Sequence, residues 1–123
     1  MSLSAQLTAD LETSIGLVEV AQGKRPAEVY ISGGRVLNVY SSEVLSQNIA
    51  IYRGRIAYVG LRETMVGRDT KVIDASVQYL APGYVNAHEH GDVLSTPTTH
   101  AQEALRRGTT TIFYNGRHLP FFT

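Results

Sequence analysis

The sequence predicts a mixed β and α/β protein, in which a small β-sandwich or barrel is followed by one β-α-β unit. Two observations carry this prediction. Between residues 27 and 77, short runs of β-branched and aromatic residues alternate with turn residues, as in all-β domains. From residue 79, a nearly continuous apolar run, a helical stretch and a second β-rich run follow in order, which is typical of two parallel strands joined by a helix.

A short helix is predicted before the β-rich region, over Asp10–Gln22, because its first residue can cap a helix. Apolar residues recur in it at helical spacing, at Leu11, Ile15 and Val18. Gly23 can end the helix, since glycine readily adopts the left-handed conformation found at helix C-termini. We expect this N-terminal helical segment to cover residues 1–24 and to lean on the β-rich region.

The β-rich region, residues 25–78, is predicted to contain several short strands. They lie at Val29–Ile31, Val36–Tyr40, Asn48–Tyr52, Arg55–Val59 and Val72–Ile73. Gly33-Gly34 and Arg53-Gly54 are predicted to form tight turns, because glycine tolerates the positive φ that a two-residue hairpin needs. No Gly-x-Gly-x-x-Gly or phosphate-loop motif accompanies these glycines.

Six apolar residues of this region are predicted to supply much of a shared core, because they lie in what the pattern suggests are adjacent strands. They are Val36, Val39, Ile49, Ile51, Ile56 and Val59. Side chains alternate between the two faces of a strand, so we expect one or two of the six to miss the core.

Residues 79–123 are predicted to form a strand, a helix and a second strand. Tyr79–His88 has the apolar texture of a strand that is buried on both faces of a parallel sheet. A helix is expected over Pro97–Arg107, because proline suits a first helical turn and an apolar stripe follows it. Gly108 closes the helix, and Thr109–Asn115 is rich in β-forming residues.

Composition excludes several classes of function for the 123 residues. Lys and Arg number 11, and Asp and Glu number 11, so the zero net charge argues against a nucleic-acid or anionic-membrane partner. The absence of cysteine excludes disulfides and thiolate metal sites. No apolar run could span a bilayer and no signal pattern starts the chain, so we expect a soluble, cytoplasmic protein.

Two of the four histidines, His88 and His90, stand two residues apart at the end of the apolar run. On a strand they share one face, with Glu89 on the other, and two neighbouring imidazoles suit zinc, iron or manganese. Spacing alone leaves open that the pair is a solvated strand end. The remaining histidines, His100 and His118, are expected on the surface.

These residues also carry a family resemblance. "PGYVNAHEH" resembles the first barrel strand of the amidohydrolase superfamily, whose usual form is Pro-Gly-φ-φ-Asp-x-His-x-His. The upstream "VIDASVQYLAPG" and the downstream "ALRRGTTTIF" resemble the N-terminal region of bacterial adenine deaminases in particular. The resemblance covers the chain from about Val18 to Phe113.

The resemblance implies a fold class in which a composite β-sandwich stands beside a (β/α)8 TIM barrel. Residues 25–78 would be the N-terminal part of that sandwich, and residues 79–123 would start the barrel with its first strand, first helix and second strand. A complete barrel needs about 250 residues, so the barrel would be incomplete here. We therefore expect this chain alone to be inactive, as a fragment, a truncated product or a piece that needs a partner.

The resemblance also implies an enzyme of purine salvage that hydrolyses adenine to hypoxanthine and ammonia. His88 and His90 would be ligands of a divalent metal (Mn, Fe or Zn), the substrate would be a purine base, and the protein would be a homo-oligomer. Two alternatives stay open. One is another amidohydrolase that opens cyclic amides, similar to dihydroorotase or hydantoinase. The other is a non-catalytic β-rich assembly domain.

The chain departs from the family pattern at two positions that bear on the site. Asn86 stands where an Asp is usual, and that residue is normally structural. After His90 the sequence reads "GDVLS", one residue shorter than the family stretch, and Asp92 stands near the position of a family Glu. Asp92 is therefore the candidate catalytic carboxylate.

Overall fold

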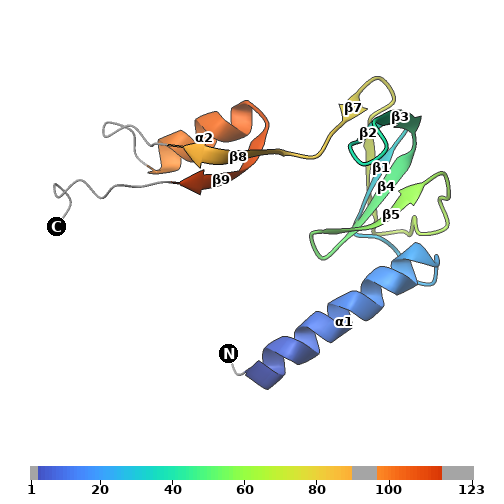
Figure 1. The fold of residues 1–123 in the computed structure, drawn as a ribbon. Coiled ribbons are helices and arrows are strands. Elements are labelled where there is room, and N and C mark those ends of the chain that lie inside the picture. The colour runs from blue at the N-terminus through green and yellow to red at the C-terminus, as the bar shows by residue number, and fades with distance from the viewer. Residues whose placement is uncertain (1–2, 90–96, 115–123) are drawn as a thin grey trace. The chain divides into compact units, whose positions relative to one another are not determined.

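The computed structural model describes residues 3–89 and 97–114, and the chain divides into two compact units, Met1–Ala81 and Pro82–Thr123 (Figure 1). Helices and sheets both occur, and the first unit is rich in β-structure. The mixed fold class is therefore confirmed at this level. The finer division at residues 24 and 78 stays a prediction.

The first unit opens with helix α1, Leu3–Ala21, which is longer than predicted because it begins seven residues before Asp10. The sequence before Asp10 contains neither Gly nor Pro, so nothing interrupts the helix there and Asp10 lies inside it. The predicted end is confirmed. Gly23 has a φ of 74°, and the N–H of Lys24 donates to the carbonyl of Glu19 at 2.9 Å, as in a glycine-terminated helix.

Two sheets follow in the first unit. One has the order β5-β4-β1-β6, with strands β1 (Val29–Ser32), β4 (Asn48–Tyr52), β5 (Arg55–Gly60) and β6 (Lys71–Asp74). The other has the order β3-β2-β7, with strands β3 (Glu43–Ser46), β2 (Arg35–Asn38) and β7 (Tyr79–Leu80). Strand β1 pairs antiparallel with β4 and parallel with β6, so neighbours in the sheet are distant in sequence.

The two glycine-containing turns have different outcomes. The Arg53-Gly54 hairpin is confirmed, since it joins β4 to β5 and both residues have positive φ, 47° and 70°. The Gly33-Gly34 hairpin is wrong, because β1 and β2 belong to different sheets and the glycines carry the chain between them. The backbone N–H of Gly33 instead donates to Oδ1 of Asn48 at 2.9 Å, which ties this crossing to β4.

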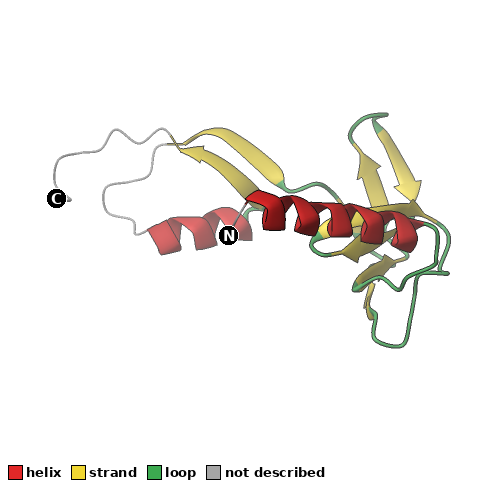
Figure 2. Cartoon of the chain, turned by 90° about the horizontal axis from the view of Figure 1, so that it is seen from below, coloured by secondary structure: helices red, strands yellow, loops and turns green. Residues whose placement is uncertain are grey.

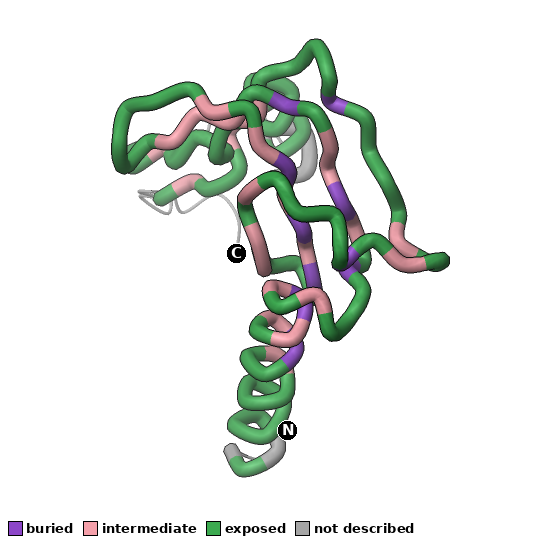
Figure 3. Tube along the Cα trace, turned by 90° about the vertical axis from the view of Figure 1, so that its right-hand side faces the viewer, coloured by how far each residue is buried: buried purple, intermediate pink, exposed green. Residues whose placement is uncertain are grey.

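The predicted core is wrong in detail. Figure 3 shows buried segments on the strands and on the helix of the first unit. The buried cluster consists of Val20, Ala27, Tyr30, Ala50, Tyr52 and Met65, and none of the six predicted side chains is in it. Val39 is 65% exposed and Ile56 is 63% exposed. Helix α1 covers the sheet face that carries Ala50 and Tyr52, and strand alternation places Ile49 and Ile51 on the opposite face.

The C-terminal half of α1 is fastened to the sheet around Tyr52. A Cβ on Gly16 would overlap the Tyr52 ring, so the helix approaches the ring as closely as glycine permits. The Arg25 guanidinium donates to the Tyr52 hydroxyl at 3.2 Å and pairs with Glu19 at 2.7 Å. The cation of Arg25 and that of Arg53 lie 5.6 and 5.7 Å from the ring centroid, within cation–π range.

The second unit contains β8 (Tyr84–Glu89), α2 (Pro97–Arg106) and β9 (Thr109–Tyr114), and the two strands pair in parallel (Figure 2). The predicted β-α-β order is confirmed. The single strand predicted over Tyr79–His88 is wrong, since β7 and β8 are separated by residues 81–83. Pro82 has no N–H for a ladder, and a Cβ on Gly83 would overlap Thr110.

Candidate metal centre

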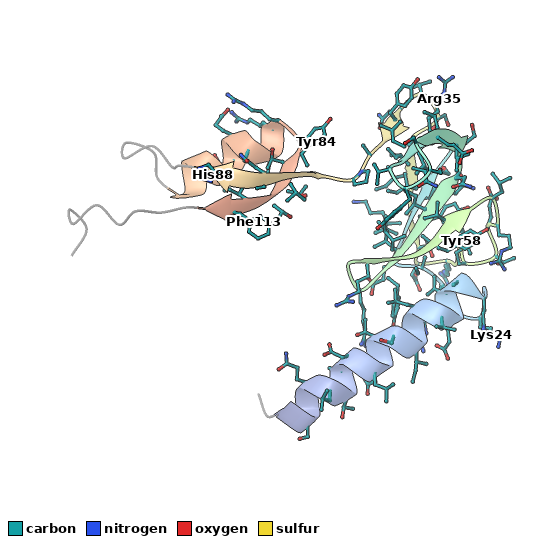
Figure 4. The ribbon with its side chains drawn as sticks, in the orientation of Figure 1. Lys24, Arg35, Tyr58, Tyr84, His88 and Phe113 are labelled. Carbon is teal, nitrogen blue, oxygen red and sulfur yellow. The ribbon has the colours of Figure 1, made fainter. Side chains whose placement is uncertain are left out.

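Strand β8 brings the candidate metal ligand His88 to the end of the second unit's sheet (Figure 4). Tyr84 at the start of β8 lies opposite Thr109 of β9, and the register shifts by one residue before Val85, which lies opposite Thr111. Because the two strands are parallel, their carboxyl ends lie at the same edge, which is the edge that carries ligand sites in (β/α) barrels. The His88 residue is exposed, so its position allows access by an ion from solvent.

The backbone that carries His88 is held by Asn86. The N–H of His88 donates to Oδ1 of Asn86 at 3.2 Å. The pairing register with β9 also shifts between Asn86 and Glu89, so the strand end departs from a regular ladder. The strand pattern places Asn86 on the same face as His88, but it does not predict this hydrogen bond to the His88 backbone. The available signal was the position of Asn86 two residues before a histidine on the same strand.

The structure does not place the other predicted ligand and catalytic residues. His90 and Asp92 lie outside the described residues, as does His118. His100 lies in α2. Whether His88 and His90 share one face therefore stays a prediction, and so does the catalytic role of Asp92.

The described donors suit a divalent metal in kind but not in number. His88 offers an imidazole, a ligand common to zinc, iron and manganese sites. Within residues 3–89 and 97–114, no group of three or more His, Asp or Glu side chains could hold a metal ion. A zinc site takes about four donors, so His88 would be one member of a larger set.

None of the helices in the described part of the chain is long and apolar enough to cross a membrane.

Comparison with known proteins finds relatives that are named adenine deaminase. The chain is 48% identical over 103 residues to the adenine deaminase of Moorella thermoacetica. The aligned segment covers 83% of this chain and 17% of that protein. It is 43% identical over 100 residues to adenine deaminase 3 of Rhizobium meliloti, covering 79% of this chain and 17% of that protein. The adenine deaminase of Paracoccus denitrificans is 40% identical over 108 residues, 85% of this chain and 18% of that protein. No family model matches the chain.

A solved structure is also similar. It is the N-acyl-D-glutamate deacylase from Bordetella bronchiseptica, complexed with zinc and a phosphonate inhibitor. The superposition has a TM-score of 0.59 at 23% sequence identity, and it covers 71% of this chain and 18% of that chain. This likeness concerns the fold alone. The chain thus spans about a sixth to a fifth of the proteins that it resembles.

Proposed function

We propose, from the similarity of this chain to curated adenine deaminases, that it forms part of a metal-dependent hydrolase that converts adenine to hypoxanthine and ammonia. The observation that carries the proposal is the 48% identity to the Moorella thermoacetica enzyme over 103 residues. The activity belongs to a protein of that enzyme's length, of which this chain matches 17%.

The same proposal assigns the two units to the parts of an amidohydrolase. The first unit would supply the N-terminal strands of a composite β-sandwich. The second would supply the first strand, first helix and second strand of a (β/α)8 barrel. Strands β8 and β9 pair in parallel and are joined by α2. This supports the barrel assignment, because a (β/α) barrel repeats such a β-α-β unit.

At the site, His88 and His90 would hold a divalent metal as neutral imidazoles. When bound, such a cation lowers the pKa of water towards about 7 and offsets negative charge that develops during attack. Asn86 would hold the His88 backbone in place through the observed hydrogen bond. Asp92 would act as a proton donor or acceptor beside the metal ligands.

The proposal extends to the setting in which the enzyme works. Its substrate would be a small purine base, its metal would be Mn, Fe or Zn, and it would act in the cytoplasm as a homo-oligomer. The zinc-bound deacylase of similar fold supports a divalent metal without fixing which one.

A chimera tests the proposal directly. The matching segment of the Moorella thermoacetica adenine deaminase is replaced by this chain, and ammonia release from adenine is measured. We expect activity to survive in the chimera and to fall by at least about 100-fold in its His88→Ala and His90→Ala variants, together with the metal content. Asp92→Ala should lower kcat while leaving the metal content unchanged.

The matched control is Glu103→Ala, which removes an exposed carboxylate of α2 that forms an ion pair with Arg106 at 2.8 Å. This variant should keep the activity and metal content of the chimera. A chimera that folds and binds metal but releases no ammonia from adenine would contradict the assigned reaction. Full activity in His88→Ala would contradict the assigned ligand.

A further inference from the structure

Helix α1 has an apolar side that the described residues of the first unit leave uncovered. Its inner side, with Leu17 and Val20, packs on the sheet. Its outer side carries four apolar side chains at helical spacing, Leu7, Leu11, Ile15 and Val18. These four, the outer stripe, are 61%, 62%, 50% and 55% exposed. The outer stripe is therefore open to solvent along about three turns of the helix.

Carboxylates border the outer stripe on both sides. In a helix with 3.6 residues per turn, Leu7 and Ile15 mark the two edges of the stripe, about 80° apart around the axis. Asp10 lies about 60° beyond the Leu7 edge, and Glu12 lies about 60° beyond the Ile15 edge. Neither carboxylate has an ion-pair partner among the residues that the structure describes. Both charges are therefore available to cations brought by another molecule.

We propose that the outer stripe binds an amphipathic helix of another protein, whose apolar face is bordered by Lys or Arg side chains. The apolar side chains of the partner cover Leu11 and Ile15, and its cations pair with Asp10 and Glu12. Apolar contact gives such an interface its affinity, while the opposite charges on its borders decide which helix binds.

The surface of α1 also offers a place for one large side chain of the partner. Ser14, Ile15, Val18 and Glu19 line a shallow hollow at the C-terminal end of the outer stripe. A large apolar side chain that enters a hollow loses more contact with water than one on a flat surface, so such positions anchor small interfaces.

The charge of α1 argues against two other occupants. The helix contains three carboxylates and no Lys or Arg, and only Glu19 is paired, with Arg25 at 2.7 Å. A second copy of the helix would bring like charges together, which repel at short range. Helices that lie on membrane surfaces are rich in Lys and Arg on their polar face, since these attract anionic lipids. A basic helix is the occupant that this surface attracts.

The small area of the outer stripe limits the strength of the complex. A stable interface buries about 800 Å² on each partner, and one side of a 19-residue helix offers less. We therefore expect a reversible complex, with a dissociation constant on the order of 100 μM at low salt. The proposal is independent of the deaminase assignment, because only the surface of α1 takes part.

Fluorescence anisotropy tests the interface with two labelled synthetic peptides of about 18 residues, the length of a helix that spans α1. Both have Leu at every third or fourth position and Ala elsewhere, and the borders of the Leu face carry Lys in one and Glu in the other. The 123-residue chain should bind the Lys peptide, and it should bind the Glu peptide at least about 10-fold more weakly. Equal binding of both peptides, or no binding of the Lys peptide at about 1 mM chain, would overturn the proposal.

A pair of double variants tests the two bordering charges. Asp10→Asn combined with Glu12→Gln should weaken binding of the Lys peptide by about 3- to 10-fold, because two surface ion pairs are lost. The matched control is Asp69→Asn combined with Glu43→Gln, which removes one Asp and one Glu that are exposed outside α1. This control should bind like the wild type. Equal weakening in both double variants would mean that the peptide responds only to net charge, against the proposal.

A pair of leucine variants tests the outer stripe itself. Leu11→Ser should weaken binding of the Lys peptide by at least about 10-fold through lost apolar contact, with helical circular dichroism unchanged. Leu61→Ser, at a side chain that is 73% exposed but lies outside α1, should bind like the wild type. Binding that survives Leu11→Ser would overturn the proposal. So would sedimentation equilibrium that shows self-association lost in Leu11→Ser, because a second copy would then be the occupant.

Discussion

The two units of this chain differ in how completely they bury their own apolar surface. The first unit encloses Tyr30, Met65 and Val20, each with no more than 1% of its surface exposed. Among residues 82–88 and 101–113 of the second unit none is buried, and Tyr84, Val85, Leu105 and Phe113 are each at least 60% exposed. Both units have paired strands, so strand pairing does not by itself indicate a closed core.

The difference follows from the number of layers and strands in each unit. The first unit packs α1 against a four-stranded sheet, and the side chains between them are excluded from water. In its described residues the second unit has two strands and one helix, a smaller assembly whose Tyr84, Val85, Leu105 and Phe113 stay in contact with water. The first unit should therefore fold on its own, whereas the second needs further structure to cover it.

The largest expected effect comes from a core deletion in the first unit. Tyr30→Ala removes a buried ring and the hydrogen bond from its hydroxyl to the carbonyl of Arg62 at 2.9 Å. We expect a loss of about 3–5 kcal/mol in the free energy of unfolding. Val85→Ala in the second unit should change it by less than about 0.5 kcal/mol. Urea denaturation followed by circular dichroism measures both, and equal effects would refute the comparison.

Hydrogen exchange sharpens the same comparison at the backbone. The amides of β1 and β4 should exchange only when the first unit unfolds. Those of β8 and β9 should exchange at least about 100-fold faster, through local opening of a small unpacked sheet. Mass spectrometry of peptides from the two regions gives the ratio. Similar protection in β4 and β8 would mean that the second unit is stabilised by contacts that its own residues do not supply.

A smaller effect is expected at the contact between α1 and the sheet. In an exposed helix Gly→Ala stabilises by about 1 kcal/mol. At Gly16 the added methyl would overlap the Tyr52 ring, so Gly16→Ala should instead destabilise the first unit by about 1–2 kcal/mol. Glu12→Ala, on an exposed position of the same helix, is the control and should be nearly neutral. Stabilisation by Gly16→Ala would show that α1 does not depend on this close approach.

Metal binding by the isolated chain should be weak, because the described residues contain no group of three or more side chains that could hold a metal ion. Zn²⁺ titration by calorimetry should detect binding that His88→Ala and His90→Ala abolish and that Glu103→Ala retains. Affinity should fall as the solution is acidified, because protons compete with the metal for the same nitrogen lone pairs. Unchanged binding in His88→Ala would remove this residue from the candidate site.

The smallest effect concerns the end of β6. The hydroxyl and backbone N–H of Ser76 both donate to Asp74, and these hydrogen bonds lower the pKa of its carboxyl below the usual 3.8. A lowered folded-state pKa means that the charged form adds stability above the unfolded pKa, and that this stability is lost as the pH falls through the folded pKa. Asp74→Ala should therefore lower Tm slightly at about pH 6, and the difference from wild type should shrink towards about pH 2. A difference that grows in acid would contradict this assignment.

Local chemistry allowed several features to be predicted from the sequence. The helix end at Gly23 and the Arg53-Gly54 turn were predictable, because glycine adopts positive φ more readily than other residues do. The order of strand, helix and strand after residue 79 was predictable because hydrophobic periodicity reports secondary structure. The His88-x-His90 spacing and its neighbours also indicated the resemblance to adenine deaminases, which the similarity to curated relatives then confirmed.

Long-range partners were decided only by the tertiary structure. Both faces of β4 carry apolar side chains, so the sequence could not tell that α1 would cover Ala50 and Tyr52 and leave Ile49 and Ile51 on the other side. Gly33-Gly34 has hairpin chemistry, yet β1 pairs with β4 and β6, so the glycines carry the chain into a second sheet. The contact from Asn86 to the His88 backbone likewise arises only at an irregular strand end. Periodicity identifies strands and helices, but the choice among competing apolar faces is made by packing between segments far apart in sequence.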